Sequence, residues 1–487
     1  MSDPEPLIIV GSSVRAAAQS AVRAGFRPWC IDQFGDRDLV EISDDVHTVT
    51  DWPNEIVSAI QSAPQAEWLY TGALENHPAL VEKLSQLRRL CGCGRETLSK
   101  LRDPTWLADT LTKASLPSLP VIVPVSTIPE SGEWMVKPLA SAAGIGVQDF
   151  PGGSVGSVDF GSRYLQRKAR GRVISGLYLG VENSARLIGM CEQVCRGSDA
   201  GELCYAYSGS FGPLSIDDVS TFRPLSPANA AGKGSQPVSR EPRIRRGEGW
   251  GEGESQSGAG PLTPALSPKT LAGQELHTTN AERANVSRER ERDSATAKHD
   301  AAVEASNRVF ALAQRIGSAI AAGVRAEGAT LRGLFGIDFV LDDETGELWT
   351  LEINPRYTAS TEIYEHVFGW PLMRWHVDAC RGRSSEAAAL LDSRSFDGGW
   401  PIYGKLIVYA ERDFAAPDIV PLVRRLSFNG HAESSVSVAD IPQIETLIQK
   451  DEPVCTLLTA QKDLVTCQEI LTAASRELLT SIGEFAA

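Results

Sequence analysis

The chain has 487 residues, a length that predicts about three domains, and 42% of them are hydrophobic, as in ordinary globular proteins. Its formal net charge of -15 argues against nucleic-acid binding through bulk charge. No apolar run is long enough to span a membrane, and the first residues, MSDPEP, lack the basic and apolar regions of a secretory signal. We therefore expect a cytoplasmic protein that binds neither nucleic acid nor membrane.

The nine cysteines are an odd number in a long chain, which suits a reducing compartment better than a disulfide framework. Two groups, Cys91 with Cys93 and Cys191 with Cys195 and Cys204, invite a zinc interpretation. Neither group has paired CxxC spacing or a nearby histidine, so thiols in the core or on the surface are the simpler interpretation.

The first 95 residues predict a small α/β unit. Residues 7–32 follow the order strand, helix, strand, with LIIV, GSSVRAAAQSAVRAGF and PWCID as the three elements. Gly11 is followed by Ser12 and Ser13, so the second and third glycines of a dinucleotide fingerprint are missing and we expect no such cofactor site. Residues 71–87, TGALENHPALVEKLSQL, are expected to close this unit with a strand and a helix.

Residues 133–147, EWMVKPLASAAGIGV, predict a short strand followed by a loop of small residues. The strand ends at Lys137, and Ser141, Gly144 and Gly146 lie in the loop. Small residues let backbone amides approach an anion, and a lysine at the strand end adds a positive charge for phosphate. The plainer alternative is a simple turn with a solvated lysine.

Residues 226–300 are rich in glycine, proline, serine and mixed charge, and contain few apolar residues. Such a composition buries too little surface to offset chain entropy, so we expect a disordered insertion. PLTPALSP and GEGWGEG resemble the translated copy of an interspersed DNA repeat. A regulatory or RNA-binding tail built on RERERD is the alternative, although acids balance bases throughout. Without the insertion, the preceding strands lead directly into an amphipathic helix at residues 307–326.

Residues 333–357, GLFGIDFVLDDETGELWTLEINPRY, predict a hairpin that turns at residues 343–347. In the simplest register Asp338 lies opposite Glu352, and Asn354 follows two residues later. One face then carries Asp338, Thr350, Glu352 and Asn354, and the apolar face carries Ile337, Phe339, Leu341, Trp349, Leu351 and Ile353. Two opposed carboxylates repel each other, and a hard cation such as Mg²⁺ or Mn²⁺ removes that penalty. The alternative is a solvated strand face.

The string LEINPR after GIDFVL resembles the metal-binding signature of the ATP-grasp superfamily, ligases that use Mg-ATP to activate a carboxylate. The resemblance implies that Asp338, Glu352 and Asn354 bind magnesium and that Arg356 contacts the transferred phosphate. It also extends to the small-residue loop. Lys137, Ser141, Gly144 and Gly146 would then belong to the loop that covers the phosphates of ATP.

Residues 163–171, RYLQRKARG, resemble the hinge strand that lines the adenine pocket in this superfamily. The resemblance implies that Gln166 lies beside the adenine, whose edge would be contacted by backbone groups from Arg167, Lys168 and Ala169.

Two positions depart from the pattern of the superfamily. The acidic residue that often binds the ribose has no counterpart at Val173 or Ile174. Pro104, in the string LRDPTW, replaces the early phosphate-binding lysine and leaves only Lys100 nearby. Binding of ATP is therefore better supported at the triphosphate than at the ribose.

The resemblance implies an ATP-grasp fold, of class α/β and α+β, in five segments. The C-terminal segment, with ADIP and KDEPVCTLLT, predicts short strands closed by a helix from about residue 459 to 485. It resembles uncharacterised ATP-grasp proteins of archaea and bacteria with tetrahydromethanopterin-linked one-carbon metabolism. The segments are a pre-domain at 1–95, the core at 96–225 and 301–385, the insertion at 226–300, and a small β-rich domain at 398–487.

The activity that the resemblance implies is transfer of the γ-phosphate of ATP to a carboxylate, followed by capture of the acylphosphate by an amine. The cofactors would be ATP with Mg²⁺ or Mn²⁺, and the substrates small molecules. The resemblance of the C-terminal segment implies a role in cofactor biosynthesis for one-carbon metabolism. Two alternatives stay open: a nucleotide-binding module without turnover, acting as sensor or scaffold, and carboxylase-like chemistry with bicarbonate. A homodimer is left open as well.

Overall fold

The computed structural model describes residues 3–123, 132–150, 161–181, 184–220, 304, 306–426 and 436–485. By its internal contacts the chain divides into residues 1–230 joined with 301–487, and residues 231–300. All described residues belong to the first of these two parts. The predicted insertion at 226–300 lies outside the described residues.

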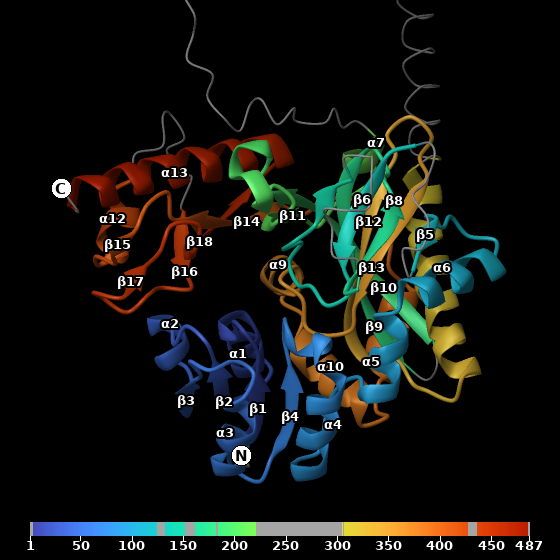
Figure 1. Cartoon of the computed structure of the whole chain (residues 1–487), viewed down its shortest axis with the longest axis horizontal. Coiled ribbons are helices and arrows are strands. Elements are labelled where there is room, and N and C mark those ends of the chain that lie inside the picture. The colour runs from blue at the N-terminus through green and yellow to red at the C-terminus, as the bar shows by residue number, and fades with distance from the viewer. Residues whose placement is uncertain are drawn as a thin grey trace, which may run out of the picture. The chain divides into compact units, whose positions relative to one another are not determined.

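The N-terminal unit, here residues 3–95, is built on a parallel sheet with strand order β3-β2-β1-β4 (Figure 1). Residues Leu7 to Val10 of β1 are all buried, as expected for a central parallel strand covered on both faces. The strand order reverses between β1 and β4, so their carboxyl ends form the crevice where α/β sheets bind ligands. The elements are β1 Glu5–Val10, α1 Arg15–Arg23, β2 Phe26–Asp32, α2 Arg37–Val40, β3 Asp45–Thr48, α3 Ile56–Ser62, β4 Glu67–Tyr70, η1 Leu74–Asn76 and α4 Pro78–Leu87.

A small antiparallel sheet of order β5-β8-β6-β7 follows two helices. The second helix begins at Pro104, because the Asp103 side chain accepts hydrogen bonds from the N–H groups of Thr105 (2.8 Å) and Trp106 (3.3 Å). Pro104 is thus the start of a helix. These elements are α5 Arg95–Leu101, α6 Pro104–Lys113, β5 Val121–Ile122, β6 Trp134–Pro138, β7 Gln148–Asp149 and β8 Arg163–Arg167.

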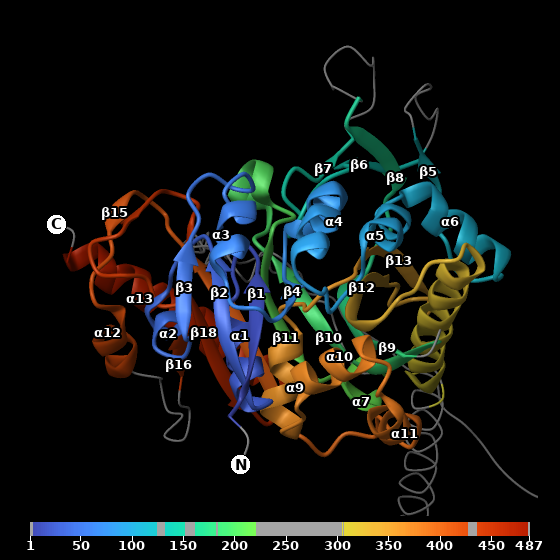
Figure 2. The ribbon, with the colours of Figure 1, turned by 90° about the horizontal axis from the view of Figure 1, so that it is seen from below.

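The large sheet has eight strands in the order β13-β12-β9-β10-β11-β14-β18-β16. Figure 2 shows the N-terminal unit in front of part of this sheet, with the small sheet beyond one end. The strands are β9 Arg172–Val181, β10 Ser184–Cys195, β11 Tyr207–Gly212, β12 Gly333–Leu341, β13 Leu348–Asn354, β14 Ile402–Tyr409, β16 Ser437–Ala439 and β18 Pro453–Gln461. The remaining elements are η3 Ser198–Leu203, α7 Ile216–Ser220, α9 Thr361–Phe368, α10 Leu372–Cys380, α11 Ser385–Asp392, β15 Phe414–Ala415, α12 Ile419–Arg425, β17 Leu447–Ile448 and α13 Leu464–Phe485.

The C-terminal region, residues 401–485, contains short strands followed by a last helix. Its strand β14 pairs with β11 of the core, so β14, β18 and β16 extend the large sheet. The last helix begins later than predicted, because Thr459 belongs to β18 and α13 starts at Leu464. The Asp463 side chain accepts a hydrogen bond from the N–H of Thr466 (2.8 Å) and so marks the start of the helix.

The helix predicted at residues 307–326 is present, and its apolar stripe is buried in the core. Val309, Ile316 and Ile320 are at most 4% exposed, and the hydroxyl of Tyr178 on β9 donates to the carbonyl of Ala313 (2.9 Å). The 3.6-residue period therefore gave both the element and its buried face. None of the described helices is both long and apolar enough to cross a membrane.

The predicted hairpin register is confirmed, since Asp338 pairs with Glu352 and Gly336 with Asn354. The predicted faces are partly wrong, because a β-bulge follows Asp338 and pairs Phe339 with Thr350, which leaves Leu351 as the extra residue. The extra residue reverses the alternation beyond it. Thr350 is therefore buried, whereas Trp349 and Leu351 are only half-buried.

Candidate active site

The two carboxylates of the hairpin stand at the centre of the candidate site. Asp338 accepts hydrogen bonds from Asn354 Nδ2 (2.8 Å) and from Gln193 Nε2 on β10 (3.2 Å). Burial, followed by the negative charge of Glu352, raises the pKa of Asp338 to about 6. The hairpin therefore brings two like charges together at a half-buried place, and a cation between them would relieve the repulsion.

The oxygen atoms present suit a divalent cation that is shared with a nucleotide. Among the residues that the structure describes, no group of three or more His, Cys, Asp or Glu side chains is arranged to hold a metal ion alone. Asp338 and Glu352 supply carboxylates, and the amide of Asn354 supplies a further oxygen. Mg²⁺ commonly takes one or two carboxylates from the protein and completes its shell with phosphate and water oxygens. The donor set fits that pattern.

Lys137 belongs to the small sheet and is connected to the hairpin through Gln166. Its buried Nζ donates to Gln166 Oε1 (3.1 Å), and Gln166 Nε2 donates to the Leu351 carbonyl (3.2 Å), which is the extra residue of the bulge. Burial opposes the charge on Lys137, but interactions with Tyr164 and with the carboxylates of Glu352 and Asp338 outweigh it and raise its pKa. The lysine is thus charged at neutral pH, and both proposed metal-binding carboxylates contribute to that charge state.

The loop after Lys137 packs against the strand β11. The N–H of Tyr207 donates to the Ala143 carbonyl (2.9 Å), and a Cβ added at Gly144 would lie 2.1 Å from the Tyr205 carbonyl oxygen. Gly144 also has a φ of +73°, so only glycine fits there. Gly146 has a φ of +77° as well. The glycines predicted to cover phosphate therefore define how this loop docks.

Arg102 is a site residue that the sequence analysis missed. Its Nη2 donates to the carbonyl of Ser141 (2.8 Å) and to Asn76 Oδ1 (3.0 Å), and its Nη1 lies 3.7 Å from Glu352 Oε2. Lys100, the cation considered instead, forms an ion pair with Glu327. The basic residue before Asp103 in LRDPTW was the available signal, but a lysine was expected after it.

Arg356 is held by the N-terminal unit. Its Nε donates to the buried carboxylate of Glu75 (2.6 Å), and its guanidinium packs against Gly72, just beyond the carboxyl end of β4. Burial opposes the charge on Arg356, but the Glu75 carboxylate outweighs it and raises the pKa. Nη2 of Arg356 lies 3.4 Å from Asn354 Oδ1, so Arg356 stands beside the carboxylate pair. Glu75 carries no motif and was not predicted.

The predicted adenine contacts are only partly free in this structure. The N–H groups of Arg167 and Lys168 donate to the carbonyls of Pro120 and Glu133, both at 2.9 Å. Two of the backbone groups in the segment from Arg167 to Ala169 are thus already used within the chain. The side chain of Lys168 donates to Tyr205 Oη (3.1 Å), so it contacts the β10–β11 connection, and Ala169 follows it in the same segment.

Gly11 and the start of α1 serve packing within the N-terminal unit. A Cβ at Gly11 would lie 1.8 Å from Thr71 Oγ1, so the glycine permits the close approach of β1 and the end of β4. The N–H of Val14 donates to the Asp32 carboxylate (2.8 Å). The start of this helix is therefore already occupied by an anion from the chain itself.

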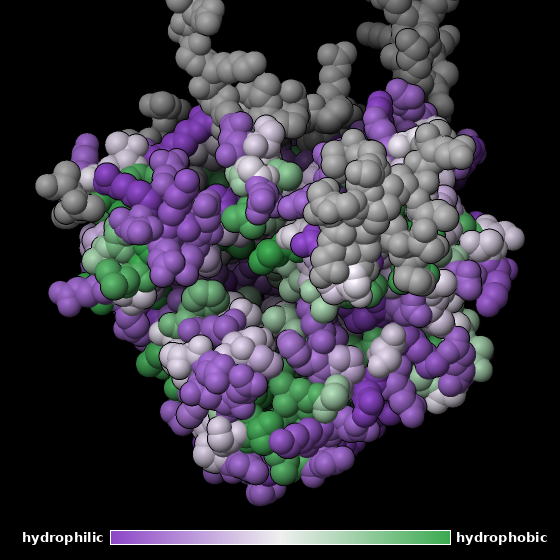
Figure 3. Space-filling view, viewed as in Figure 1, coloured by the Kyte–Doolittle hydropathy of each residue, from purple (hydrophilic) through white to green (hydrophobic). Residues whose placement is uncertain are grey.

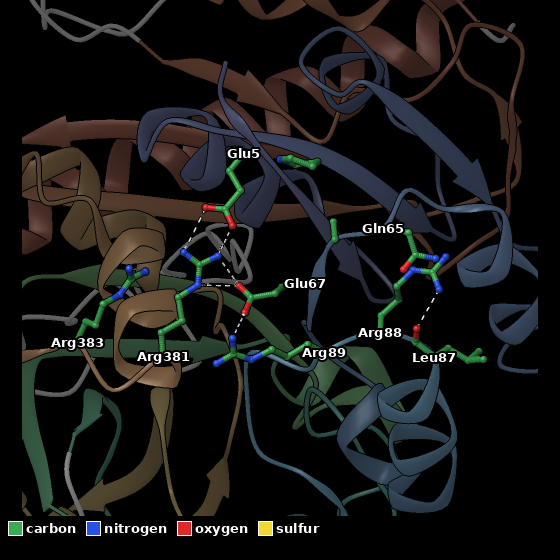
Figure 4. A pocket seen from close by; sticks show the side chains of 10 residues that line it. Glu5, Gln65, Glu67, Leu87, Arg88, Arg89, Arg381 and Arg383 are labelled. Carbon is green, nitrogen blue, oxygen red and sulfur yellow. Dashed lines mark hydrogen bonds and ion pairs between the residues drawn. The ribbon is translucent and has the colours of Figure 1, made fainter. Parts of the chain in front are cut away.

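A cavity of about 700 Å³ lies at the opposite, amino end of β1 and β4 (Figure 4). Arg381 sits between Glu5 and Glu67 there, and Arg89 pairs with Glu67 (3.1 Å). The charged side chains at the centre of this cavity therefore already pair with one another. By contrast, Figure 3 shows the surface hollowed near the middle of the view, where the N-terminal unit, the core and the C-terminal region meet.

Comparison with known proteins identifies the fold. No family model matches the chain, and neither does any curated protein. Among solved structures, N5-carboxyaminoimidazole ribonucleotide synthetase with ADP matches with a TM-score of 0.56 and 12% identity, over 99% of both chains. Biotin carboxylase from Campylobacter jejuni matches with a TM-score of 0.54 and 11% identity, over 98% of this chain and 95% of that chain. L-amino acid ligase from Bacillus licheniformis matches with a TM-score of 0.54 and 10% identity, over 98% of both chains.

The chain has the ATP-grasp fold. These neighbours are ATP-grasp carboxylate-amine ligases, and they span nearly the whole chain, so the predicted fold class is confirmed. At 10–12% identity the likeness concerns the fold, and the roles of individual residues rest on the geometry above.

Proposed function

We propose that this ATP-grasp protein is an ATP- and Mg²⁺-dependent ligase, which activates a carboxylate as an acylphosphate for attack by an amine. One observation carries the proposal: the opposed carboxylates Asp338 and Glu352 share their surroundings with two cations, the buried Lys137 and the half-buried Arg356, which come from different parts of the chain. Positive groups around a paired-carboxylate metal site are what phosphoryl transfer requires, because negative charge develops on the transferred oxygens.

The roles follow from position. Asp338, Glu352 and Asn354 would hold Mg²⁺, which when bound neutralises phosphate charge. Lys137 and Arg356 would bind phosphate oxygens, and the loop with Ser141, Gly144 and Gly146 would cover them. Gln166 holds Lys137 in place, and the segment Arg167 to Ala169 would border the adenine.

The chemistry needs no nucleophile from the protein. A substrate carboxylate oxygen attacks the γ-phosphorus of ATP and ADP leaves; an amine then attacks the acyl carbon and phosphate leaves. The neighbouring structures include an L-amino acid ligase and a biotin carboxylase, so an amine and bicarbonate are both reasonable test substrates. The narrower prediction, cofactor biosynthesis in one-carbon metabolism, rests on the C-terminal resemblance alone.

The test is product analysis with Mg-ATP and a panel of carboxylic acids, including bicarbonate, each paired with amines. We expect ADP and phosphate, formed only when a suitable acid is present. Release of AMP and pyrophosphate would contradict the proposed reaction. Tight binding of ATP with no release of ADP across the panel would favour the nucleotide-sensor alternative instead.

A further inference from the structure

The short turn η1, Leu74–Asn76, follows β4 of the N-terminal unit and reaches two candidate phosphate contacts from other parts of the chain. Glu75 pairs with Arg356, which follows β13 of the large sheet. Asn76 donates to the carbonyl of Ser141, in the small-residue loop that follows β6. Two consecutive residues of one turn therefore hold groups that come from two different sheets.

Glu75 is a buried carboxylate with Arg356 as its partner. It is 0% exposed, and its Oε1 accepts from Arg356 Nε at 2.6 Å. Its Oε2 has no hydrogen-bond partner among the residues that the structure describes. A carboxylate at this depth is tolerated only beside a cation, so the ion pair fixes both side chains. The N-terminal unit thus sets the place of the guanidinium.

The ion pair also decides which nitrogens of Arg356 face the reaction centre. Glu75 occupies Nε, and Nη2 lies 3.4 Å from Oδ1 of the metal-ligand candidate Asn354. An arginine held at one edge offers its remaining donors in a fixed direction. An anion bound at the proposed metal site would therefore meet Nη2.

The backbone beside Arg356 is held from the same unit. The hydroxyl of Tyr70, the last residue of β4, contacts the carbonyls of Cys93 (2.8 Å) and Pro355 (3.2 Å). Pro355 directly precedes Arg356. The N-terminal unit thus restrains both the side chain of this arginine and the chain that carries it.

Asn76 holds the small-residue loop through a closed set of hydrogen bonds. Its Nδ2 donates to the Ser141 carbonyl (3.1 Å), and its Oδ1 accepts from Arg102 Nη2 (3.0 Å). The same Nη2 donates to the Ser141 carbonyl (2.8 Å). The loop cannot leave the turn at Ser141 without breaking two hydrogen bonds.

The backbone that leads into the turn is strained. Ala73 has a φ of +80° and a ψ of -30°, a conformation that residues other than glycine rarely adopt. Such conformations persist where the surrounding structure holds them, and they gather at functional sites. The strain at Ala73 thus accompanies the contacts that Glu75 and Asn76 make.

We propose that the turn Leu74–Asn76 sets the spacing of the two phosphate contacts, with Glu75 as a positioning residue for Arg356 and Asn76 as one for the small-residue loop. The inference rests on the proposed function, which assigns Arg356 and the loop to phosphate. Each residue acts through the group that it holds. The N-terminal unit thereby takes part in recognition of the γ-phosphate.

Calorimetric titration of the full chain with Mg-ADP and with the Mg²⁺ complex of a non-hydrolysable ATP analogue tests the inference. Glu75→Asp keeps the charge but shortens the side chain by one methylene, so Arg356 loses its fixed place. Affinity for the triphosphate should fall about tenfold, and affinity for ADP should change less than about twofold. Glu75→Gln keeps the length and an acceptor oxygen, so it should lose less than Glu75→Asp.

Asn76→Ala removes both contacts to the loop and should weaken binding of both nucleotides about fivefold, because the loop covers phosphates that they share. Asn76 is half-buried, so this variant tests the turn even if Glu75→Asp does not fold. The matched controls, Glu82→Asp and Asn54→Ala, change exposed residues of the same unit and should bind both nucleotides as wild type does. Thermal unfolding of each variant precedes titration.

Equal affinity of wild type for the two nucleotides would overturn the inference, because Arg356 would then make no contact with the γ-phosphate. An equal loss for both nucleotides in Glu75→Asp would indicate a structural role only. Wild-type affinities in Glu75→Asp or in Asn76→Ala would contradict it as well. Since the titration involves no turnover, failure of the ligase proposal would appear separately, as absence of acid-dependent ADP.

Discussion

Arg102 Nη1 lies 3.7 Å from Glu352 Oε2, while Nη2 of the same guanidinium holds the Ser141 carbonyl at 2.8 Å. One side chain thus joins a proposed metal ligand to the loop proposed to cover phosphate. We predict that Arg102→Ala weakens Mg-ATP binding on the order of tenfold, and that Arg102→Lys recovers only part of the loss, because lysine lacks the fork of donors. Titration with a non-hydrolysable ATP analogue measures this, and unchanged affinity in both variants would remove Arg102 from the site.

Glu352 permits the sharpest test of the metal assignment. Glu352→Gln keeps the shape and removes the charge, so turnover should fall on the order of 10²-fold or more, with an unchanged thermal midpoint. Glu347→Gln is the matched control, because Glu347 lies in the exposed turn of the same hairpin. Normal activity and Mg²⁺ dependence in Glu352→Gln would show that the ligand assignment is wrong.

Glu362 joins three parts of the chain, because Arg15 of the N-terminal unit and Lys405 of the C-terminal region both pair with it. Glu362→Gln leaves two buried cations short of a partner, so we predict a loss of about 3–5 kcal/mol in the free energy of unfolding. Glu386→Gln, at an exposed position of α11, should change it little. Denaturant unfolding of both variants provides the comparison.

The pH dependence of Glu362 has a definite sign. Burial alone would raise its pKa, but Arg15 and Lys405 outweigh burial and hold the pKa well below its usual range. The stabilisation is therefore present above the unfolded pKa of about 4.3 and is lost as pH falls below it. Wild type should lose more stability on acidification than Glu362→Gln, and parallel pH profiles would contradict the assignment.

The contribution of Asp36 to stability changes with pH in the opposite direction. Burial, and next the charge of Asp440, raises its pKa to about 9, above the unfolded value of about 3.9, so wild type carries a penalty that is absent at low pH and grows as pH rises toward 9. Asp36→Asn should therefore stabilise the protein at neutral pH, on the order of a few kcal/mol, and have little effect near pH 4. A thermal midpoint that falls at neutral pH would indicate an unseen favourable contact.

The hairpin shows what the sequence predicts and where it stops. Alternation and turn residues were enough to place Asp338 opposite Glu352, since both depend on local pattern. The bulge at Leu351 was not predictable, because its carbonyl turns toward Gln166, a residue 185 positions away in the chain. The burial of Thr350 could not be predicted either, because it follows from the same bulge.

Contacts between residues from distant segments also could not be predicted from a single sequence. Glu75 and Arg356 are 281 positions apart, and nothing in the sequence near either residue indicates the other. Arg102 lies in the string LRDPTW, which the sequence analysis had singled out. Which basic residue near that string contacts the small-residue loop depends on where α6 begins. Asp103 and Pro104 set that start. Asp36 has no motif at all, and its burial is visible only after folding.

Trapping of the acylphosphate tests the central claim most directly. Such an intermediate is an electrophile that hydroxylamine captures, whereas a nucleotide sensor forms none. With Mg-ATP and the correct carboxylic acid, the ligase account predicts the matching hydroxamate together with one equivalent of ADP, and Glu352→Gln should form neither. AMP and pyrophosphate in place of ADP, with any acid of the panel, would contradict the account even though the fold stands.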